Sequence, residues 1–372
     1  MSQVSGHIAS GFEPVRTAFE ANFADDGELG AGFAVWLGDE LVVDLIGGHA
    51  DRKRTHDWSA ETLVPVYSTT KPIAALVIAR LVDQGLVDYD QPLAEYWPEF
   101  AAHGKDAVTV AQVLSHQAGL SGFTEPIDPA LWLDPPALAG ELAQLEPMWV
   151  PGDGSGYHPL TWGYLAGELV ARVSGRTLGT ILREDICGPL GIDFHIGTPA
   201  SEHARAAEVK RPTAMADLGE LNAFRRAAFL TKWGSPNKGG AIWRETEIPS
   251  ANGHGTAVSV ARLFSAYASK GRIGETRLFS EDTWHELTRQ RCRGDDRVLP
   301  FEMSFAAGVM RNDQLVYGPN PETLAHSGWG GSIGLGDPGL GLSAAYVMNK
   351  QSNKLQGDPR AARLIEALYS CL

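Results

Sequence analysis

The chain has 372 residues, of which 44% are apolar and 20% charged, and its formal net charge is -14. This length is enough for one large domain or two, and the ordinary composition excludes an intrinsically disordered chain. The negative charge argues against binding to nucleic acid or to an anionic membrane, because both would be repelled.

The cysteines and the N-terminus point to a cytoplasmic protein with free thiols. The three cysteines, Cys187, Cys292 and Cys371, are too few and too scattered for a disulfide framework. The stretch MSQVSGHIASGFEPV lacks the basic and apolar segments of a signal peptide, and no apolar run has the roughly 18 residues of a membrane span. Because no metal-binding His or Cys motif is found either, we expect no cofactor.

The first half of the chain predicts a helix, a hairpin and then a long helical region. Roughly the first 25 residues have an amphipathic pattern, and GFAVWLGDELVVDLIGG forms two apolar runs that meet at Gly38 and Asp39. From about Thr62 to Arg291 helical patterns and loops dominate, and the long patterns end near glycines, as helices should.

The tail returns to strands and ends in a helix. The strand candidates are SFAAGVM, QLVYG, TLAHSGWGGSIGL and GLSAAYVMN, and the helix candidate is DPRAARLIEALYSCL. Strands at both ends predict an α+β fold, in which an antiparallel sheet built from both termini is flanked by helices and a helical lobe is inserted. We expect one domain from residues 1–61 and 292–372, a mainly helical domain from residues 62–291, and a site in the cleft between them.

One serine stands in a motif typical of hydrolases. Ser332 lies at the centre of GWGGSIG, which matches Gly-x-Ser-x-Gly. In a nucleophile elbow that serine sits between a strand and a following helix. Here the glycine-rich stretch IGLGDPGLG and then a strand pattern follow, and neither predicts a helix. The sequence therefore argues against Ser332 as a nucleophile.

A Ser-x-x-Lys motif gives two further candidates. SPNK, from Ser235 to Lys238, lies among glycines and a proline and predicts a loop. STTK, from Ser68 to Lys71, instead opens a helix that is apolar nearly all round, with Pro72 in its first turn. Lys71 then shares a face with Ser68, and the helix start favours developing negative charge. Since serine is also a favoured helix cap, these residues alone leave a capping role open.

A serine nucleophile needs a nearby base, for which the sequence offers several candidates. Lys71 is one. Tyr157 ends the glycine-rich loop in PGDGSGYHPLTWGYLAGELV and could act as a phenolate if Lys71 stabilised that charge. His158 is a third candidate, although its place beside a helix start favours a cap or a supporting hydrogen bond. Packing on the core is the ordinary alternative for Tyr157.

STTK, GYHP and HSGWGGSIG, together with their surroundings, resemble the serine β-lactamase and penicillin-binding-protein superfamily. The closest resemblance is to its family VIII carboxylesterases, and it extends over nearly the whole chain. It implies that Ser68 is the nucleophile, Lys71 its proton-transfer partner and Tyr157 the general base. It also aligns HSG, from His326 to Gly328, with the Lys-Thr-Gly box of the superfamily. The backbone N–H groups of Ser68 and Trp329 would then form the oxyanion hole.

Two departures from the pattern favour ester substrates. Pro159 stands where lactam-processing relatives have asparagine, and His326 stands where they have lysine. Both changes remove contacts for an acylamino-carboxylate substrate. We therefore expect a serine carboxylesterase that acts on small, short-acyl esters. A β-lactamase, a D-Ala-D-Ala peptidase or an acyltransferase would use the same residues, and a non-enzymatic scaffold of this fold is the remaining alternative.

Further residues are candidates for lining the substrate site, although each could equally be packing. The oligomeric state is not predicted. The candidates are His326, Ser327, Gly328, Gly330, His158, Asn252, His254 and Trp149.

Overall fold

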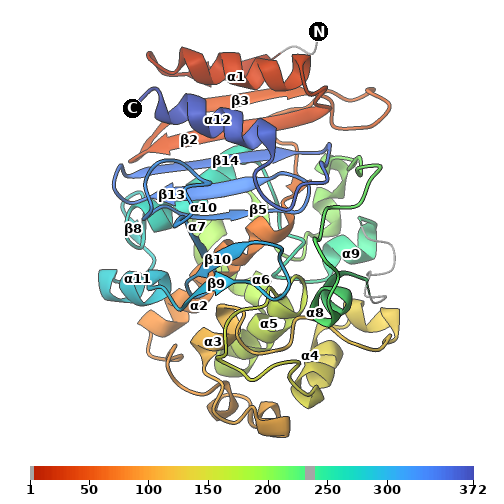
Figure 1. Cartoon of the computed structure of the whole chain (residues 1–372). Helices are drawn as coiled ribbons and strands as arrows, with labels where there is room; N and C mark the ends of the chain where they lie inside the picture. The colour runs from red at the N-terminus through yellow and green to blue at the C-terminus, as the bar shows by residue number, and fades with distance from the viewer. Residues whose placement is uncertain (1–3, 231–238) are drawn as a thin grey trace.

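The computed structural model describes residues 4–230 and 239–372. Its main feature is an antiparallel sheet with the strand order β1-β3-β2-β14-β13-β12-β11-β10-β9 (Figure 1). The strands come from both ends of the chain, which confirms the predicted α+β class. They are β1 (Val4–Ile8), β2 (Gly30–Leu37), β3 (Glu40–Gly48), β9 (Cys292–Asp295), β10 (Glu302–Phe305), β11 (Met310–Arg311), β12 (Leu324–Ser327), β13 (Ile333–Asp337) and β14 (Leu342–Met348).

The two ends of the chain meet at the pair β2 and β14. Leu342 lies opposite Leu37, and Met348 lies opposite Ala31. Every residue of β14 is buried, because helices cover both faces of the sheet at this point. On one face lie α1 (Glu13–Ala24) and α12 (Pro359–Tyr369), side by side in Figure 1, and on the other lies α10 (Ala257–Ala268).

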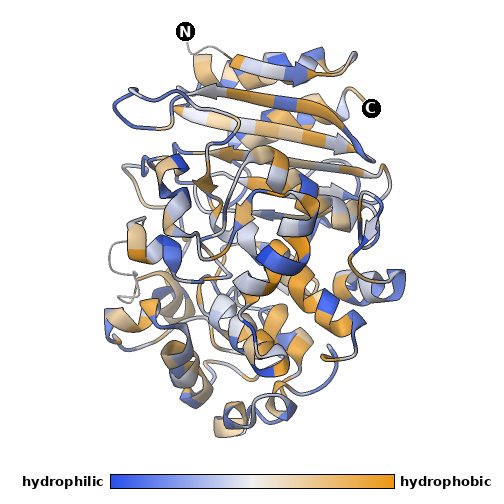
Figure 2. Ribbon diagram, turned by 180° about the vertical axis from the view of Figure 1, so that it is seen from behind, coloured by the Kyte–Doolittle hydropathy of each residue, from blue (hydrophilic) through white to orange (hydrophobic). Residues whose placement is uncertain are grey.

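Helix α2 (Thr70–Asp83) is the centre of the helical region. Apolar side chains surround it on nearly all sides, so it is buried among its neighbours, as the sequence predicts. Hydrophobic residues predominate on the central strands and the inner helices (Figure 2). The other helices are α3 (Val110–Leu114), α4 (Pro135–Gln144), α5 (Thr161–Ser174), α6 (Leu178–Ile181), α7 (Gly188–Leu190), α8 (Ala223–Arg225), α9 (Ala241–Glu245) and α11 (Glu281–Thr288).

Short strands complete the architecture. They are β4 (Val64–Pro65), β5 (Phe194–His195) and β6 (His254–Gly255) in one small sheet, and β7 (Arg272–Ile273) and β8 (Thr276–Arg277) in another. Helix α10 belongs to the range 62–291 yet packs on the main sheet, and one hydrophobic core joins that sheet face to α2. The division at residues 62 and 291 stays a prediction.

Two local predictions are wrong. The helix predicted for the first 25 residues begins only at Glu13, because residues 4–8 form β1, whose backbone pairs with β3. QLVYG is a turn and not a strand, since Leu315 has a φ of 57° and the Tyr317 N–H bonds to the Asn312 side chain. Ser235 to Lys238, the second Ser-x-x-Lys match, lies outside the described residues.

Within those described ranges, every helix is too short or too polar to cross a membrane.

Candidate active site

Ser68 lies in the short 3-10 turn Tyr67–Thr69 that leads into α2. It is partly exposed between two buried neighbours. Neither that turn nor α2 has a side-chain hydrogen bond at its cap, so Ser68 does not serve as a helix cap. Tyr67 has a φ of 48°, a conformation that non-glycine residues rarely adopt and that is common next to reactive groups.

Lys71 is completely buried and points at the Ser68 hydroxyl. Its Nζ lies 3.2 Å from Ser68 Oγ and 3.0 Å from the Tyr157 hydroxyl, and it donates to the carbonyl oxygens of Pro159 at 2.8 Å and Ser250 at 3.0 Å. Burial holds the pKa of Lys71 well below its usual range. A neutral amine fits these contacts, because two N–H groups can serve the carbonyls and the lone pair can face a hydroxyl.

Tyr157 is fixed by a carboxylate from a distant part of the chain. Asp296, which is buried, accepts the Tyr157 backbone N–H at 2.9 Å and the Ser155 hydroxyl at 2.8 Å. Burial raises the pKa of the Tyr157 phenol. Burial therefore disfavours the charged forms of both groups, the Tyr157 phenolate and the Lys71 ammonium.

Ser332 is buried beside the same site but has a different partner. Its Oγ donates to the carbonyl oxygen of Val66 at 2.8 Å, and the Gly328 N–H donates to the Ser332 carbonyl at 2.7 Å. Strand β13 follows directly, so there is no nucleophile elbow. The segment from Gly328 to Gly331 lies between β12 and β13, and it is here called the oxyanion turn after the role that the family resemblance implies for the Trp329 N–H.

A mostly apolar cavity that includes Ser68 in its lining opens to solvent. Among the described residues, the backbone N–H groups of Ser68 and Trp329 donate to no backbone carbonyl. Both residues line the cavity, and neither N–H is bound to a backbone group of the described structure there. The lining residues are Tyr67, Ser68, Tyr157, Pro159, Leu160, Phe229, Ala251, Leu299, Phe301, Met310, His326, Ser327, Trp329, Leu355 and Gln356.

Four of the predicted substrate-binding residues lie at this cavity or in its turn. His326 is buried, its Nδ1 bonds to the Ser327 carbonyl at 2.7 Å, and its Nε2 has no partner in the described structure. Burial lowers the pKa of His326 to about 3, so it is neutral. The Ser327 hydroxyl bonds to the Tyr317 hydroxyl at 2.7 Å. Gly328 and Gly330 belong to the oxyanion turn.

The structure does not bring the other candidates to the cavity. Asn252 uses its amide to bind three backbone groups, and His254 is buried against the Asn252 carbonyl. His158 accepts the Leu120 N–H at 3.0 Å, which gives it the supporting role expected as an alternative. Trp149 packs against the His158 ring and lies outside the lining.

Sequence reasoning missed most of the apolar wall and the residue that holds Tyr157. Phe229, Leu299, Phe301 and Met310 come from parts of the chain that carry no motif. Asp296 also accepts the N–H groups of Val298 and Leu299, which is a local turn pattern without any signal for the distant tyrosine. In the described ranges, no group of three or more His, Cys, Asp or Glu residues could hold a metal ion.

The profile of the beta-lactamase family matches residues 15–368. The chain belongs to the beta-lactamase family. It is 37% identical over 362 residues to the esterase/beta-lactamase LipL of Mycobacterium tuberculosis, a match that covers 94% of this chain and 83% of LipL.

Two solved members of this fold match over their whole length. A family VIII carboxylesterase is 41% identical, with a TM-score of 0.92, and the alignment covers 100% of both chains. A penicillin-binding-protein homologue from Caulobacter crescentus is 55% identical, with a TM-score of 0.97 and 100% coverage of both chains. These findings confirm the resemblance drawn from the motifs.

Proposed function

We propose that this protein is a serine carboxylesterase that hydrolyses small, uncharged, short-acyl esters through an acyl-enzyme on Ser68. The observation that carries the proposal is the 3.2 Å contact between Ser68 Oγ and the buried Lys71 amine, at the base of an apolar cavity. A serine hydroxyl becomes a useful nucleophile when such a base can take its proton. The names of LipL and of the solved family VIII carboxylesterase support ester hydrolysis.

The proposed reaction begins with proton transfer from Ser68 to Lys71 as Oγ attacks the ester carbonyl carbon. Tyr157, 3.0 Å from Lys71 Nζ, relays the proton to the departing alkoxide, which leaves as an alcohol. The backbone N–H groups of Ser68 and Trp329 hold the tetrahedral oxyanion, at about 3 kcal/mol for each donor. Water then attacks the acyl-enzyme, and its proton follows the same route until Ser68 is regenerated with release of the carboxylic acid.

The lining supports an ester in preference to a β-lactam or a peptide. None of the described lining residues is a lysine or an arginine, and the low pKa of His326 leaves that position without a cation. Among the described residues that line this cavity, a substrate carboxylate would find no cation to offset its lost hydration. Nonpolar acyl groups fit the wall formed by Leu299, Phe301 and Met310.

A substrate panel on the wild type and Ser68→Ala tests the proposal. The panel consists of p-nitrophenyl esters of increasing acyl length, with nitrocefin as the β-lactam and an added alcohol as an acyl acceptor. We expect short esters to be turned over fastest, nitrocefin slowly or not at all, and Ser68→Ala to lose both turnover and labelling by a phosphonate. Faster turnover of nitrocefin than of every ester would contradict the proposal, as would a fully active Ser68→Ala variant.

A further inference from the structure

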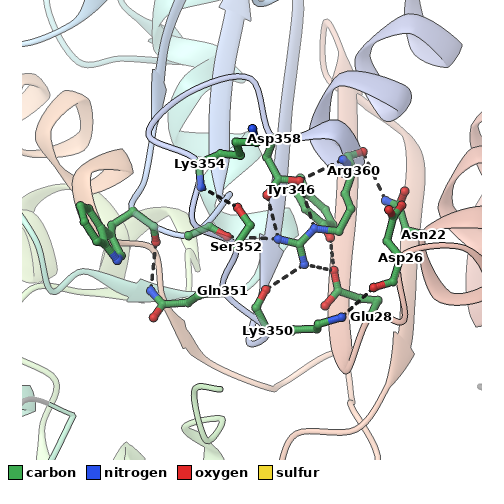
Figure 3. Close-up of polar contacts among 12 residues, drawn as sticks. Asn22, Asp26, Glu28, Tyr346, Lys350, Gln351, Ser352, Lys354, Asp358 and Arg360 are labelled. Atoms are coloured by element: carbon green, nitrogen blue, oxygen red, sulfur yellow. Dashed lines mark hydrogen bonds and ion pairs between the residues drawn. The ribbon is translucent and has the colours of Figure 1, made fainter. Parts of the chain in front are cut away.

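A buried ionic cluster packs directly against the oxyanion turn. Arg360, at the start of α12, lies between Glu28 and Asp358 (Figure 3). Its Nη1 is 2.6 Å from Glu28 Oε2, and its Nη2 is 2.9 Å from Asp358 Oδ2. All three side chains are at most 5% exposed. Tyr346 also donates its hydroxyl to Glu28, so the cluster is linked to β14.

The cluster and its neighbours bind the carbonyl groups of the turn. Arg360 Nη2 donates to the carbonyl oxygen of Gly330 at 3.1 Å, and the Ser352 N–H donates to the same oxygen at 2.9 Å. Gln351, which is buried, donates its side-chain amide to the carbonyl oxygen of Trp329 at 3.1 Å. The consecutive carbonyl oxygens of Trp329 and Gly330 therefore both accept hydrogen bonds from residues outside the turn.

The close packing of the turn against these residues requires glycine at positions 330 and 331. A Cβ on Gly331 would lie 2.5 Å from Asp358 Oδ2 and 2.9 Å from Arg360 Nη2. A Cβ on Gly330 would lie 2.6 Å from the Gln351 side chain. The turn thus packs against the cluster at a distance that only glycine permits.

We propose that Arg360 and Gln351 are positioning residues for the oxyanion hole. This inference rests on the proposed function, because it assigns the Trp329 N–H to the substrate oxygen. The Gly331 N–H donates to the Gly328 carbonyl at 3.1 Å, so fixing the second half of the turn also fixes the Gly328–Trp329 peptide group. A donor stabilises a transition state best when it is already aimed at the developing charge. Arg360 and Gln351 hold the next two peptide groups of the turn, and the bond from the Gly331 N–H to the Gly328 carbonyl passes that restraint to the Gly328–Trp329 peptide group.

Another arginine on α12 provides a matched control. Arg363 bonds to Asn22 at 2.6 Å and to Asp26 at 2.7 Å, which ties α12 to α1 and its following loop. Within the described residues, its hydrogen bonds and ion pairs are with Asn22, Asp25 and Asp26 and not with the oxyanion turn. If the arginines of α12 acted only by stabilising the fold, changes at Arg360 and Arg363 would affect thermal stability and leave catalysis at folded temperatures intact.

The experiment compares Gln351→Met, Arg360→Lys and Arg363→Lys with the wild type. Methionine keeps the volume of Gln351 but cannot donate, and lysine keeps the positive charge beside Glu28 but loses the planar fork. We expect kcat for p-nitrophenyl acetate to fall by about tenfold or more in the first two variants with KM little changed. Inhibition by a boronic acid, whose tetrahedral adduct places an oxygen in the hole, should weaken by a similar factor. Arg363→Lys should match the wild type in both assays.

The outcomes separate this inference from the proposed function. Suppose that the wild type hydrolyses esters through Ser68 and that Gln351→Met keeps the wild-type kcat and boronate inhibition. This result would overturn the positioning role and leave the esterase proposal standing. An equal loss of activity in Arg363→Lys would also overturn it, because that loss would be a stability effect.

Amide hydrogen exchange in the peptide containing Trp329 tests the positioning role without an activity assay. Faster exchange in Gln351→Met and in folded Arg360→Lys, but not in Arg363→Lys, supports the positioning role even if the wild type hydrolyses no ester, and unchanged exchange contradicts it.

Discussion

Ser68 and Ser332 lie in adjacent segments of the folded chain, yet only one of them has the environment of a nucleophile. Thr69, the neighbour of Ser68, has its hydroxyl 3.3 Å from that of Ser332. Ser68 is partly exposed to the cavity and has a buried amine at 3.2 Å. Ser332 is 1% exposed and donates to the carbonyl of Val66. A carbonyl cannot take a proton from a hydroxyl, so the partner of each serine, rather than its motif, decides what it can do.

The largest expected loss of activity follows from removing the amine of Lys71, the proposed base beside Ser68. Lys71→Met should lower kcat for short esters by about 10³- to 10⁴-fold, because the proton of Ser68 then has no acceptor of suitable pKa. Lys105 is the matched control. It is also fully buried and binds the carbonyls of Ala102 and Leu145, away from the cavity. A folded Lys105→Met should keep its activity, and equal losses in both variants would mean that burial of any lysine matters rather than its place beside Ser68.

The same lysine sets the direction of the pH dependence. Its folded pKa lies below the ordinary unfolded value, so between the two values the unfolded chain binds more protons. The free energy of unfolding contributed by Lys71 therefore rises with pH across that window and is lost as pH falls. Turnover should rise as pH passes upward through the folded pKa of Lys71 and then level off, since the neutral amine is the proposed base. Urea unfolding of the wild type and Lys71→Met from neutral to alkaline pH measures this, and an identical slope in both would contradict the depressed pKa.

A smaller loss of activity is expected from a change at Gly328, where the oxyanion turn packs against the segment that carries Ser68. A Cβ on Gly328 would lie 2.2 Å from the Val66 carbonyl oxygen and 2.1 Å from Ser332 Oγ. Gly328→Ala should push the oxyanion turn away from the Ser68 segment and reduce kcat by about 10²-fold, the scale of one lost oxyanion donor. Gly140→Ala in α4 is the control, because a Cβ there meets nothing within 4 Å. Full activity in Gly328→Ala would show that the two segments need not pack so closely.

The sequence predicted the parts of the candidate site that depend on local patterns. Ser68 and Lys71 share one helix start, and Tyr157 ends a glycine-rich loop before α5, so local patterns mark them as candidates, while their expected roles come from the family resemblance. The hairpin at Gly38 and the buried α2 followed from periodicity in the same way. The strand pattern after Ser332 correctly excluded an elbow.

The parts that sequence reasoning missed depend on contacts between distant residues. Asp296 meets Tyr157 across 139 positions, and Arg360 meets Glu28 across 332. No local pattern indicates such pairs. Burial accounts for two other differences from the sequence-based expectations. The Asn252 amide binds backbone groups instead of lining the cavity, and burial raises the pKa of the Tyr157 phenol, whose ionisation was expected only if Lys71 stabilised the charge.

The smallest expected effect belongs to the serine with the more familiar motif. Ser332→Ala removes one buried hydrogen bond, but the Val66 carbonyl still accepts the Thr69 N–H at 3.2 Å and is not left without a donor. The loss should therefore be about 1 kcal/mol of unfolding free energy, with kcat reduced by less than about tenfold. Because the Gly328 N–H still donates to the backbone of residue 332, the turn keeps its shape. Steady-state kinetics beside Ser68→Ala measures the contrast, and an inactive, folded Ser332→Ala would reverse the assignment of the two serines.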